Sequence, residues 1–293
     1  ETVGAMAEMG LMGLNIPEEY GGAGLDEISK VLVVSEVARC CASTAEILAV
    51  HLLVNDIILR KGTTEQRAKY LPMAVEGKLG AFCLTEPNAG SDAAGVRTKA
   101  VKDGKSYVLN GNKCFISNFG PDEGNHFVII ALTYPEKGTR GGMTAFLVER
   151  GTPGLSLGKT EDKMGMRAAT VSELILEECR VPESAVMGKE GDGFQIAMSG
   201  LDGGRIGIAA QAVGLAQGAL EEGVKYAKER VQFGKPLCAN QGLQWYIADM
   251  ATRVEAARLL ALQAAGLRQN GLPVSKNAYM AKYYAAETAT YVC

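Results

Sequence analysis

The spacing of hydrophobic residues changes twice along the chain. Apolar positions recur at helical spacing up to about residue 79, fall into short β-rich runs from about 80 to 187, and return to helical spacing from 188 to 293. This order predicts an α+β multidomain protein, with a helical N-terminal domain (1–79), a largely antiparallel β domain (80–187) and a C-terminal helix bundle (188–293).

Helices are predicted in the two flanking regions. In the first, the spacing indicates helices over 26–40 and 45–61 and a short helix over 65–70 that ends before Pro72. In the last, a long helix is expected to open at 202–205, with Asp202 as its N-cap. Two apolar stripes with small residues indicate closely packed antiparallel helices that also present an oligomer surface. The stripes are Ala209, Val213, Ala216, Leu220, Val224 and Ala227, and Ile247, Met250, Val254, Ala257 and Leu260.

Strands are predicted in the middle region, over 127–133, 144–148 and 171–176. The runs 106–110 and 113–116 flank the dipeptide Asn110-Gly111, which is a preferred two-residue turn. This pattern predicts a tight hairpin at Asn110-Gly111.

Charge and composition narrow the possible partners. A net charge of −3 argues against nucleic acid or an anionic membrane as the main partner. No apolar run approaches the roughly 18–20 residues that cross a bilayer, so no membrane span is expected. The first ten residues carry Glu1 and Glu8 and no basic cluster, which argues against a signal peptide. The chain opens without methionine and stops at Cys293 within a helical pattern, so we expect a fragment that lacks both ends.

The cysteines and histidines limit the kinds of site that the chain could form. The seven cysteines are scattered and form no C-x-x-C pair, which predicts neither a disulfide framework nor a zinc site and favours a reducing compartment. The two histidines have no ligand-spaced neighbours, so no metal is expected and a general base is more readily a carboxylate.

The segment 82–118 is the most informative stretch. A polar turn of small residues, 85–92 (TEPNAGSD), follows a short apolar run, and the segment ends in 115–117 (FIS). Taken alone, the loop is equally consistent with an ordinary turn between strands, because Pro, Asn and Gly commonly make turns.

Six segments in this order resemble the acyl-CoA dehydrogenase family, across essentially the whole chain, and the chain is most similar to its short-chain (butyryl-CoA type) members. The segments are 20–24 (YGGAG), 85–92 (TEPNAGSD), 115–117 (FIS), 163–165 (KMG), 201–205 (LDGGR) and 230–236 (RVQFGKP). Two apparent nucleotide motifs fail: 191–193 (GDG) lacks the third glycine and the preceding strand, and 61–63 (KGT) is no phosphate loop.

The resemblance implies FAD as cofactor. Thr85 would offer hydrogen bonds to the flavin edge, Gly90 would let the backbone come close, and Phe115 would pack on the ring. Many relatives carry Trp and Thr where this chain has Phe115 and Ser117, and these replacements keep an aromatic plate and a hydroxyl. Phe115 could instead belong to the core. The implied cofactor-binding residues of this region are Phe82, Leu84, Thr85, Gly90, Ser91, Phe115, Ile116 and Ser117.

The resemblance also implies contacts from the helical region. Arg230, Phe233 and Gln241 would reach across a subunit interface to the FAD diphosphate and adenine, where a guanidinium gives bidentate contacts. The alternative is an ordinary solvated charge at a helix end. The acyl-CoA substrate would be bound by Ser91, Asp202, Gly203, Gly204 and Arg205.

No catalytic base is expected in this chain. Some relatives carry the catalytic glutamate just before the arginine of 201–205, where this chain has Gly204. In the others the base is a glutamate in a C-terminal loop, which would lie beyond Cys293, so the isolated chain is expected to turn over little.

The implied activity is FAD-dependent α,β-dehydrogenation of acyl-CoA thioesters to 2-enoyl-CoA in fatty acid β-oxidation, with electrons passed to an electron-transferring flavoprotein. The resemblance further implies a homotetramer (a dimer of dimers), located in the cytoplasm of a prokaryote or the mitochondrial matrix of a eukaryote. Three alternatives stay open: an acyl-CoA oxidase, an enoyl-CoA reductase, or a non-catalytic flavin- or CoA-binding relative.

Overall fold

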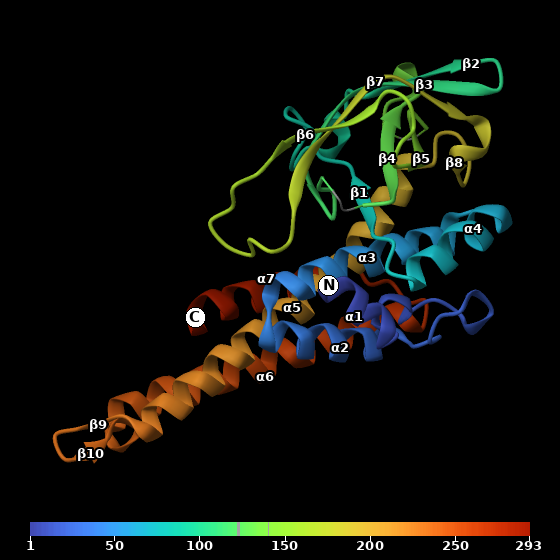
Figure 1. Ribbon diagram of the computed structural model, residues 1–293. Helices are drawn as coiled ribbons and strands as arrows, with labels where there is room; N and C mark the ends of the chain where they lie inside the picture. Colours follow the sequence, from blue (N-terminus) through green and yellow to red (C-terminus); the bar gives the residue numbers. More distant parts are fainter. Residues whose placement is uncertain (122–123, 140) are drawn as a thin grey trace. The chain divides into compact units, whose positions relative to one another are not determined.

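The computed structural model describes residues 1–121, 124–139 and 141–293. Helices at both ends of the sequence flank a middle region of strands, which confirms the predicted α+β class (Figure 1). By internal contacts the chain forms two compact units that are discontinuous in sequence, Glu1–Leu25 with Val50–Leu201, and Asp26–Ala49 with Asp202–Cys293. The three domain boundaries drawn from the sequence stay a prediction.

The helices follow the predicted pattern, except that one continues past Pro72 and another begins before Asp202. They are α1 (Thr2–Glu8), α2 (Glu27–Cys40), α3 (Ala42–Lys61), α4 (Thr64–Val75), α5 (Gly193–Glu229), α6 (Gln241–Gln269) and α7 (Ser275–Val292). Short 3-10 turns are η1 (Leu11–Gly13), η2 (Glu18–Tyr20), η3 (Ala93–Gly95), η4 (Pro135–Lys137), η5 (Glu183–Ala185) and η6 (Leu237–Ala239).

Helix α4 runs through the proline that was expected to end it. Thr63 Oγ1 accepts from Gln66 N–H, and Gln66 Oε1 accepts from Thr63 N–H, so a capping box fixes the start of the helix. Leu71 and Ala74 are fully buried. Burying these positions keeps the helix going past Pro72, at the expense of one backbone hydrogen bond.

Helix α3 corrects the expectation about apolar runs. This helix, Ala42–Lys61, contains an 18-residue window with a mean hydropathy of 1.5, so by length and composition alone it is long and apolar enough to cross a membrane. Of that window, 67% is buried inside the protein, which is the pattern of a core helix.

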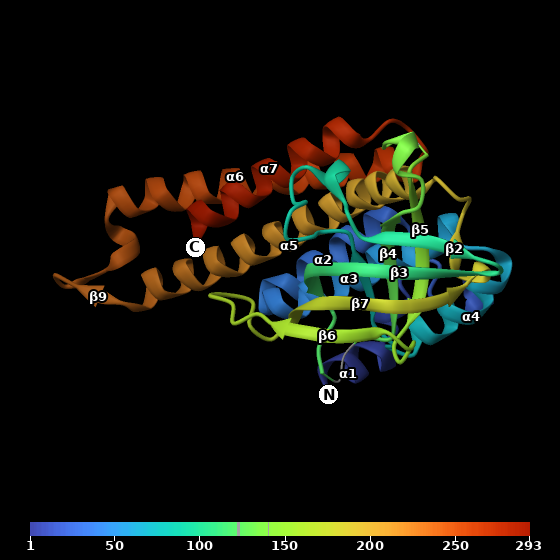
Figure 2. The same ribbon diagram turned by 90° about the horizontal axis from the view of Figure 1, so that it is seen from above.

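The strands of the first unit form one mixed but mostly antiparallel sheet. The strands are β1 (Gly80–Cys83), β2 (Lys99–Asp103), β3 (Ser106–Ser117), β4 (His126–Leu132), β5 (Met143–Glu149), β6 (Leu155–Thr160), β7 (Val171–Pro182) and β8 (Val186–Met187). The order is β6-β7-β3-β2-β4-β5-β8, and β1 pairs in parallel with β4. Strands β6, β7, β3 and β2 lie side by side in Figure 2.

Strand β4 has apolar residues on both faces because both faces are covered. Phe127 and Ile129 pack with residues of β3 and β7 in one core cluster. Val128 and Ile130 pack with residues of α3 and α4 in a second cluster. Since successive side chains of a strand point to opposite faces, a strand between two cores reads as a continuous apolar run.

The hairpin predicted at Asn110-Gly111 is wrong. Strand β3 continues through this dipeptide with an irregular register against β7, and the hairpin that does form joins β2 to β3 after Asp103. A Cβ on Gly111 would lie 2.4 Å from Thr98 Oγ1 and 2.7 Å from Thr98 Cα. Glycine is needed here for a close approach of two backbones, which is the other common role of glycine inside a strand.

We expect Gly111→Ala to destabilise the protein by about 2 kcal/mol, because the added methyl group would displace the backbone at Thr98. The measurement is the urea midpoint, with Gly165→Ala as control, since no atom lies within 4 Å of a Cβ placed there. Equal midpoints for the two variants would contradict the account of Gly111.

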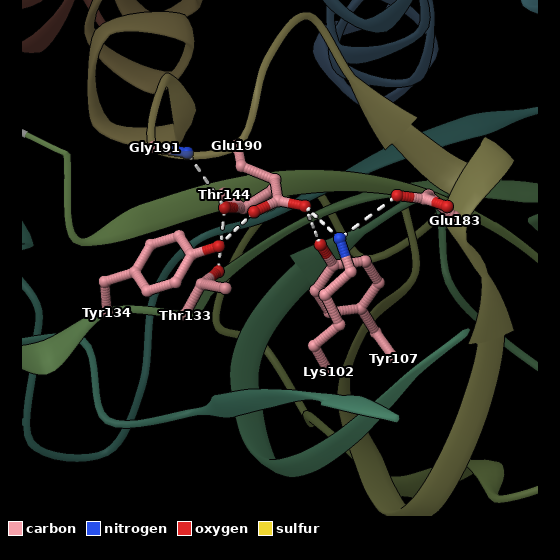
Figure 3. A network of polar contacts seen from close by, with 8 residues as sticks. All are labelled: Lys102, Tyr107, Thr133, Tyr134, Thr144, Glu183, Glu190 and Gly191. Atoms are coloured by element: carbon pink, nitrogen blue, oxygen red, sulfur yellow. Dashed lines mark hydrogen bonds and ion pairs between the residues drawn. The ribbon is translucent and has the colours of Figure 1, made fainter. Parts of the chain in front are cut away.

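A polar network ties the segment before α5 to the sheet (Figure 3). The Glu190 carboxylate accepts from Lys102 Nζ at 2.8 Å and from the hydroxyls of Tyr107 and Tyr134. Lys102, with the two tyrosine hydroxyls, lowers the pKa of Glu190 to about 2. Lys102 also reaches Glu183 at 3.1 Å. The chain that leads into α5 is therefore held on β2, on β3 and on the segment that follows β4.

The second unit contains closely packed helices. A Cβ on Gly214 would lie 2.0 Å from Ser35 O, and one on Gly218 would lie 2.3 Å from Arg39 O, so α5 and α2 meet backbone to backbone. Helices α6 and α7 lie side by side and bury mostly alanines, among them Ala257. The expectation of close packing through small residues is confirmed. A short hairpin, β9 (Val231–Gln232) and β10 (Lys235–Pro236), joins α5 to α6.

Candidate functional site

The loop after β1 is folded back onto the end of β3. Reciprocal backbone bonds between Glu86 and Ala89, at 3.0 and 3.1 Å, close the turn at the start of the loop. Cys114 N–H donates to Thr85 O at 2.9 Å, which joins the loop to β3. The segments 82–92 and 115–117, far apart in sequence, therefore meet in the first unit, as the prediction of a shared site requires.

Strand β3 ends in a bulge that turns one aromatic ring outward. The register against β7 shifts between Lys113 and Ile116, and Phe115 takes a left-handed backbone conformation with φ of 58°. Its side chain is 62% exposed, while Cys114 and Ile116 on either side are buried. A left-handed conformation is costly for a residue with a Cβ and is typical of functional sites. The alternative that Phe115 belongs to the core is excluded.

Two predicted cofactor residues are covered by the fold. The Ile116 side chain lies in the core cluster with residues of β4 and β7, so only its backbone can face a ligand. Leu84 is 7% exposed and packs in the other core cluster. Phe82 and Thr85 are half-buried.

The tip of the loop is open. Gly90 and Ser91 are exposed, and a Cβ on Gly90 would have no atom within 4 Å. An aromatic ring, hydroxyls and an unobstructed backbone suit a flat group with an apolar face and polar edges, so the residues present fit an FAD isoalloxazine.

The sequence reasoning missed a buried ion pair under the loop. Lys113 Nζ lies 2.8 Å from Glu86 Oε1, with side-chain exposures of 0% and 3%. Burial alone would raise the pKa of Glu86, but Lys113 and backbone N–H groups hold that pKa below its usual value. Burial lowers the pKa of Lys113. The signal available in the sequence was a lysine at the start of the predicted strand 113–116, directly before three apolar residues.

The predicted substrate residues on α5 lie in the second unit. Asp202 accepts from Arg205 at 3.0 Å and from the Ser275 hydroxyl at 2.6 Å. The Arg205 guanidinium stacks 4.4 Å from the centroid of the Tyr279 ring. The arginine and the carboxylate are therefore held by neighbours within the helical unit.

The prediction that Asp202 caps the helix is wrong. Helix α5 begins at Gly193, and the buried Ile196 and Ala197 place its first turns in a core. A Cβ on Gly203 would lie 2.8 Å from Arg268 Nη2, so this glycine allows close packing of α5 against α6. Gly204 is partly exposed beside it.

The three residues expected to cross a subunit interface lie at the far end of α5 and the start of α6. Arg230, Phe233 and Gln241 are all exposed, and Phe233 is 99% exposed at a left-handed turn position with φ of 52°. A large apolar ring held in this way has no packing role within its own chain. Their contacts with a cofactor stay a prediction.

Metal and disulfide chemistry find no support in the described ranges. Among these residues, no group of three or more His, Cys, Asp or Glu side chains could hold a metal ion. The cysteines are free, and Cys83, Cys114 and Cys179 are buried.

The sequence matches three family models. They are the acyl-CoA dehydrogenase N-terminal domain over residues 1–78, the middle domain over 81–179 and the C-terminal domain over 191–293.

Known proteins match over nearly the whole chain. An acryloyl-CoA reductase (NADH) of Anaerotignum propionicum is 52% identical over 100% of this chain and 74% of its own length. The structure of butyryl-CoA dehydrogenase from Megasphaera elsdenii is 44% identical with a TM-score of 0.95, over 99% of this chain and 76% of that one. A structure named for the electron transferring flavoprotein of Acidaminococcus fermentans is 47% identical with a TM-score of 0.96. The match also covers 99% of this chain and 76% of that one. The domain models, the relatives and the bonding of the loop to β3 agree: this chain belongs to the acyl-CoA dehydrogenase family.

Proposed function

We propose that the protein binds FAD and dehydrogenates acyl-CoA thioesters between the α and β carbons, giving 2-enoyl-CoA. The observation that carries the proposal is the bond from Cys114 N–H to Thr85 O, which joins the loop to β3 directly before Phe115, whose ring is exposed. The family of the chain supports the same function.

Different residues of the loop and of β3 are proposed to contact different parts of the cofactor. Phe115 supplies an aromatic plate, and Thr85, Ser91 and Ser117 supply short hydroxyls for the polar edge and the phosphate region. Gly90 leaves the backbone free for close approach. FAD, when bound, supplies acceptance of the β-hydrogen as hydride, while the protein supplies orientation and exclusion of water.

The base proposed for removal of the α-proton is a carboxylate, and neither histidine of this chain is accessible enough to serve instead. His51 and His126 are both fully buried. Gly204 has no side chain, so α5 does not supply the base at the position where some family members carry it. Asp202 is engaged with Arg205 and Ser275, which suits binding of the CoA thioester rather than proton abstraction.

A short acyl chain is the proposed substrate, supported by the likeness to butyryl-CoA dehydrogenase. The test is anaerobic addition of butyryl-, octanoyl- or isovaleryl-CoA to the FAD-loaded full-length protein, because the catalytic base is expected outside residues 1–293. We expect butyryl-CoA to bleach the visible absorption of oxidised flavin fastest and to yield crotonyl-CoA. A protein that binds FAD but is bleached by none of the three would overturn the proposed activity.

The reverse reaction is a second candidate, favoured by the 52% identity to a protein named acryloyl-CoA reductase (NADH). Oxidation of NADH that depends on acryloyl-CoA and an electron-transferring flavoprotein would identify a reductase. Oxygen uptake with acyl-CoA, in the absence of any flavoprotein acceptor, would identify an acyl-CoA oxidase instead.

We further propose a homotetramer in which Arg230, Phe233 and Gln241 of one subunit contact the FAD of another, and an electron-transferring flavoprotein as electron acceptor. The exposure of all three residues supports the first part, and the likeness to a structure named for such a flavoprotein supports the second. The proposed compartment is the cytoplasm for a prokaryotic source and the mitochondrial matrix for a eukaryotic one.

A further inference from the structure

A buried ion pair lies at the base of the loop that the proposed function assigns to FAD. Lys113 on β3 is fully buried, and the Glu86 side chain is 3% exposed. Neither residue has surface to offer a ligand, so the pair is not itself part of the binding surface. Its partners lie on the two segments that form the site.

The Glu86 carboxylate closes the loop from inside. Oε2 accepts from Arg97 N–H at 2.7 Å, and Oε1 accepts from Thr98 N–H at 3.0 Å and from Lys113 Nζ at 2.8 Å. Residues 86 and 97–98, at the two ends of the loop, are thereby held to one carboxylate. Hydrogen bonds to a charged acceptor are among the stronger ones in proteins.

The Lys113 ammonium ties the same loop to β3. Besides Glu86, it donates to Leu84 O at 3.1 Å, one residue before the carbonyl of Thr85 that accepts from Cys114 N–H at 2.9 Å. Two consecutive carbonyls of the loop are thus fixed by two consecutive residues of β3. The next residue on β3 is Phe115, whose ring points outward.

We propose that Glu86 and Lys113 are positioning residues, which set the distance and orientation of the loop relative to Phe115 and so preorganise the FAD site. The inference rests on the proposed function, because it gives a role to a pair that touches no ligand. Preorganisation raises affinity by removing the entropic cost of ordering the loop on binding.

Removal of one charge of the pair is expected to disturb the loop more than removal of both charges. Removing one partner leaves the other charge buried and uncompensated, whereas removing both leaves a neutral site. The neighbouring thiols cannot replace Glu86, because burial raises the pKa of Cys83 to about 12 and also raises the pKa of Cys114. A charge-specific role therefore predicts partial rescue of a single variant by a second substitution.

The test compares Lys113→Met, Glu86→Gln and the double variant with the unaltered protein. Affinity for FAD is measured by quenching of FAD fluorescence on titration with apoprotein, and circular dichroism gives the folded fraction. We expect Lys113→Met to bind FAD at least tenfold more weakly per folded molecule. We expect the double variant to recover at least threefold of that loss.

Tyr134→Phe is the matched control. It removes one donor from Glu190, another lysine-paired carboxylate of the same unit, which makes no hydrogen bond with residues 84–98 (Figure 3). This variant is expected to bind FAD within twofold of the unaltered protein.

Either of two results overturns the inference. One is unchanged FAD affinity in the folded fraction of Lys113→Met. The other is a double variant that binds no better than Lys113→Met, which would mean that the loss in Lys113→Met does not come from the unpaired charge of Glu86. Failure of the unaltered protein to bind FAD would instead overturn the proposed function, so the two failures are distinguishable.

Discussion

Replacing Gly90 by valine is expected to weaken FAD binding about 100-fold while leaving the stability of the apoprotein unchanged. No atom lies within 4 Å of a Cβ built on Gly90, so the chain leaves open space where the new side chain begins. It would fill the space in which the cofactor approaches the loop, and overpacking of this kind costs about 1–3 kcal/mol. A loss of about 3 kcal/mol corresponds to roughly 100-fold in affinity.

The control for Gly90→Val is Gly4→Val in α1, where a Cβ also meets no atom within 4 Å. Fluorescence titration with FAD and urea unfolding of the apoprotein are measured for both variants. If Gly90→Val bound FAD as tightly as Gly4→Val, the loop would not be in contact with the cofactor.

Between pH 7 and pH 5 the protein is expected to lose about 4 kcal/mol of unfolding free energy through two buried histidines, about 2 kcal/mol from each. Burial lowers the pKa of His51 to about 3 and that of His126 to about 4. Each imidazole in the unfolded chain has a pKa of about 6.5. As the pH falls below that value, the unfolded chain binds protons that the folded chain does not, and stability is lost.

The surroundings of the two rings explain their neutrality. His51 Nδ1 accepts from Gly80 N–H at 3.3 Å, and the His126 ring lies 5.6 Å from the Tyr70 ring, centroid to centroid. Glu149 favours protonation of His126 but is outweighed by burial. The lowered pKa of Glu190 makes its contribution below about pH 4.5, outside this window.

The chain has two histidines, so NMR can follow each imidazole directly. Neither resonance is expected to titrate between pH 8 and pH 5 in the folded protein. His126→Leu should lose only about 2 kcal/mol between pH 7 and pH 5, half the loss of the unaltered protein. The same acid sensitivity in both proteins would refute the assignment to His126.

Elements with a strong local pattern could be predicted from the sequence, and those defined by distant contacts could not. The apolar run of β4 and the stripe of α5 were correctly placed, because burial of both strand faces or of one helix face leaves a periodic signal. Gly111 was misread as a turn, since only the closeness of Thr98 distinguishes a tight backbone contact from a hairpin. The start of α5 was placed too late because an aspartate inside a helix resembles a cap.

In the site, too, features with a local sequence pattern could be predicted and features that depend on distant contacts could not. The loop and the triplet at 115–117 were found through the resemblance, and the structure brings them together. The left-handed conformation of Phe115 and the burial of Ile116 depend on a bulge that no local pattern announces. The ion pair joins residues 27 positions apart on a loop and a strand, so its geometry could be seen only in the folded chain.

The most direct test of the account is a crystal structure of the protein with FAD bound. The account predicts the isoalloxazine between Phe115 and the loop at Thr85, with the backbone of Gly90 close to the cofactor. A ring system bound elsewhere, with Phe115 and Thr85 left in solvent, would contradict it.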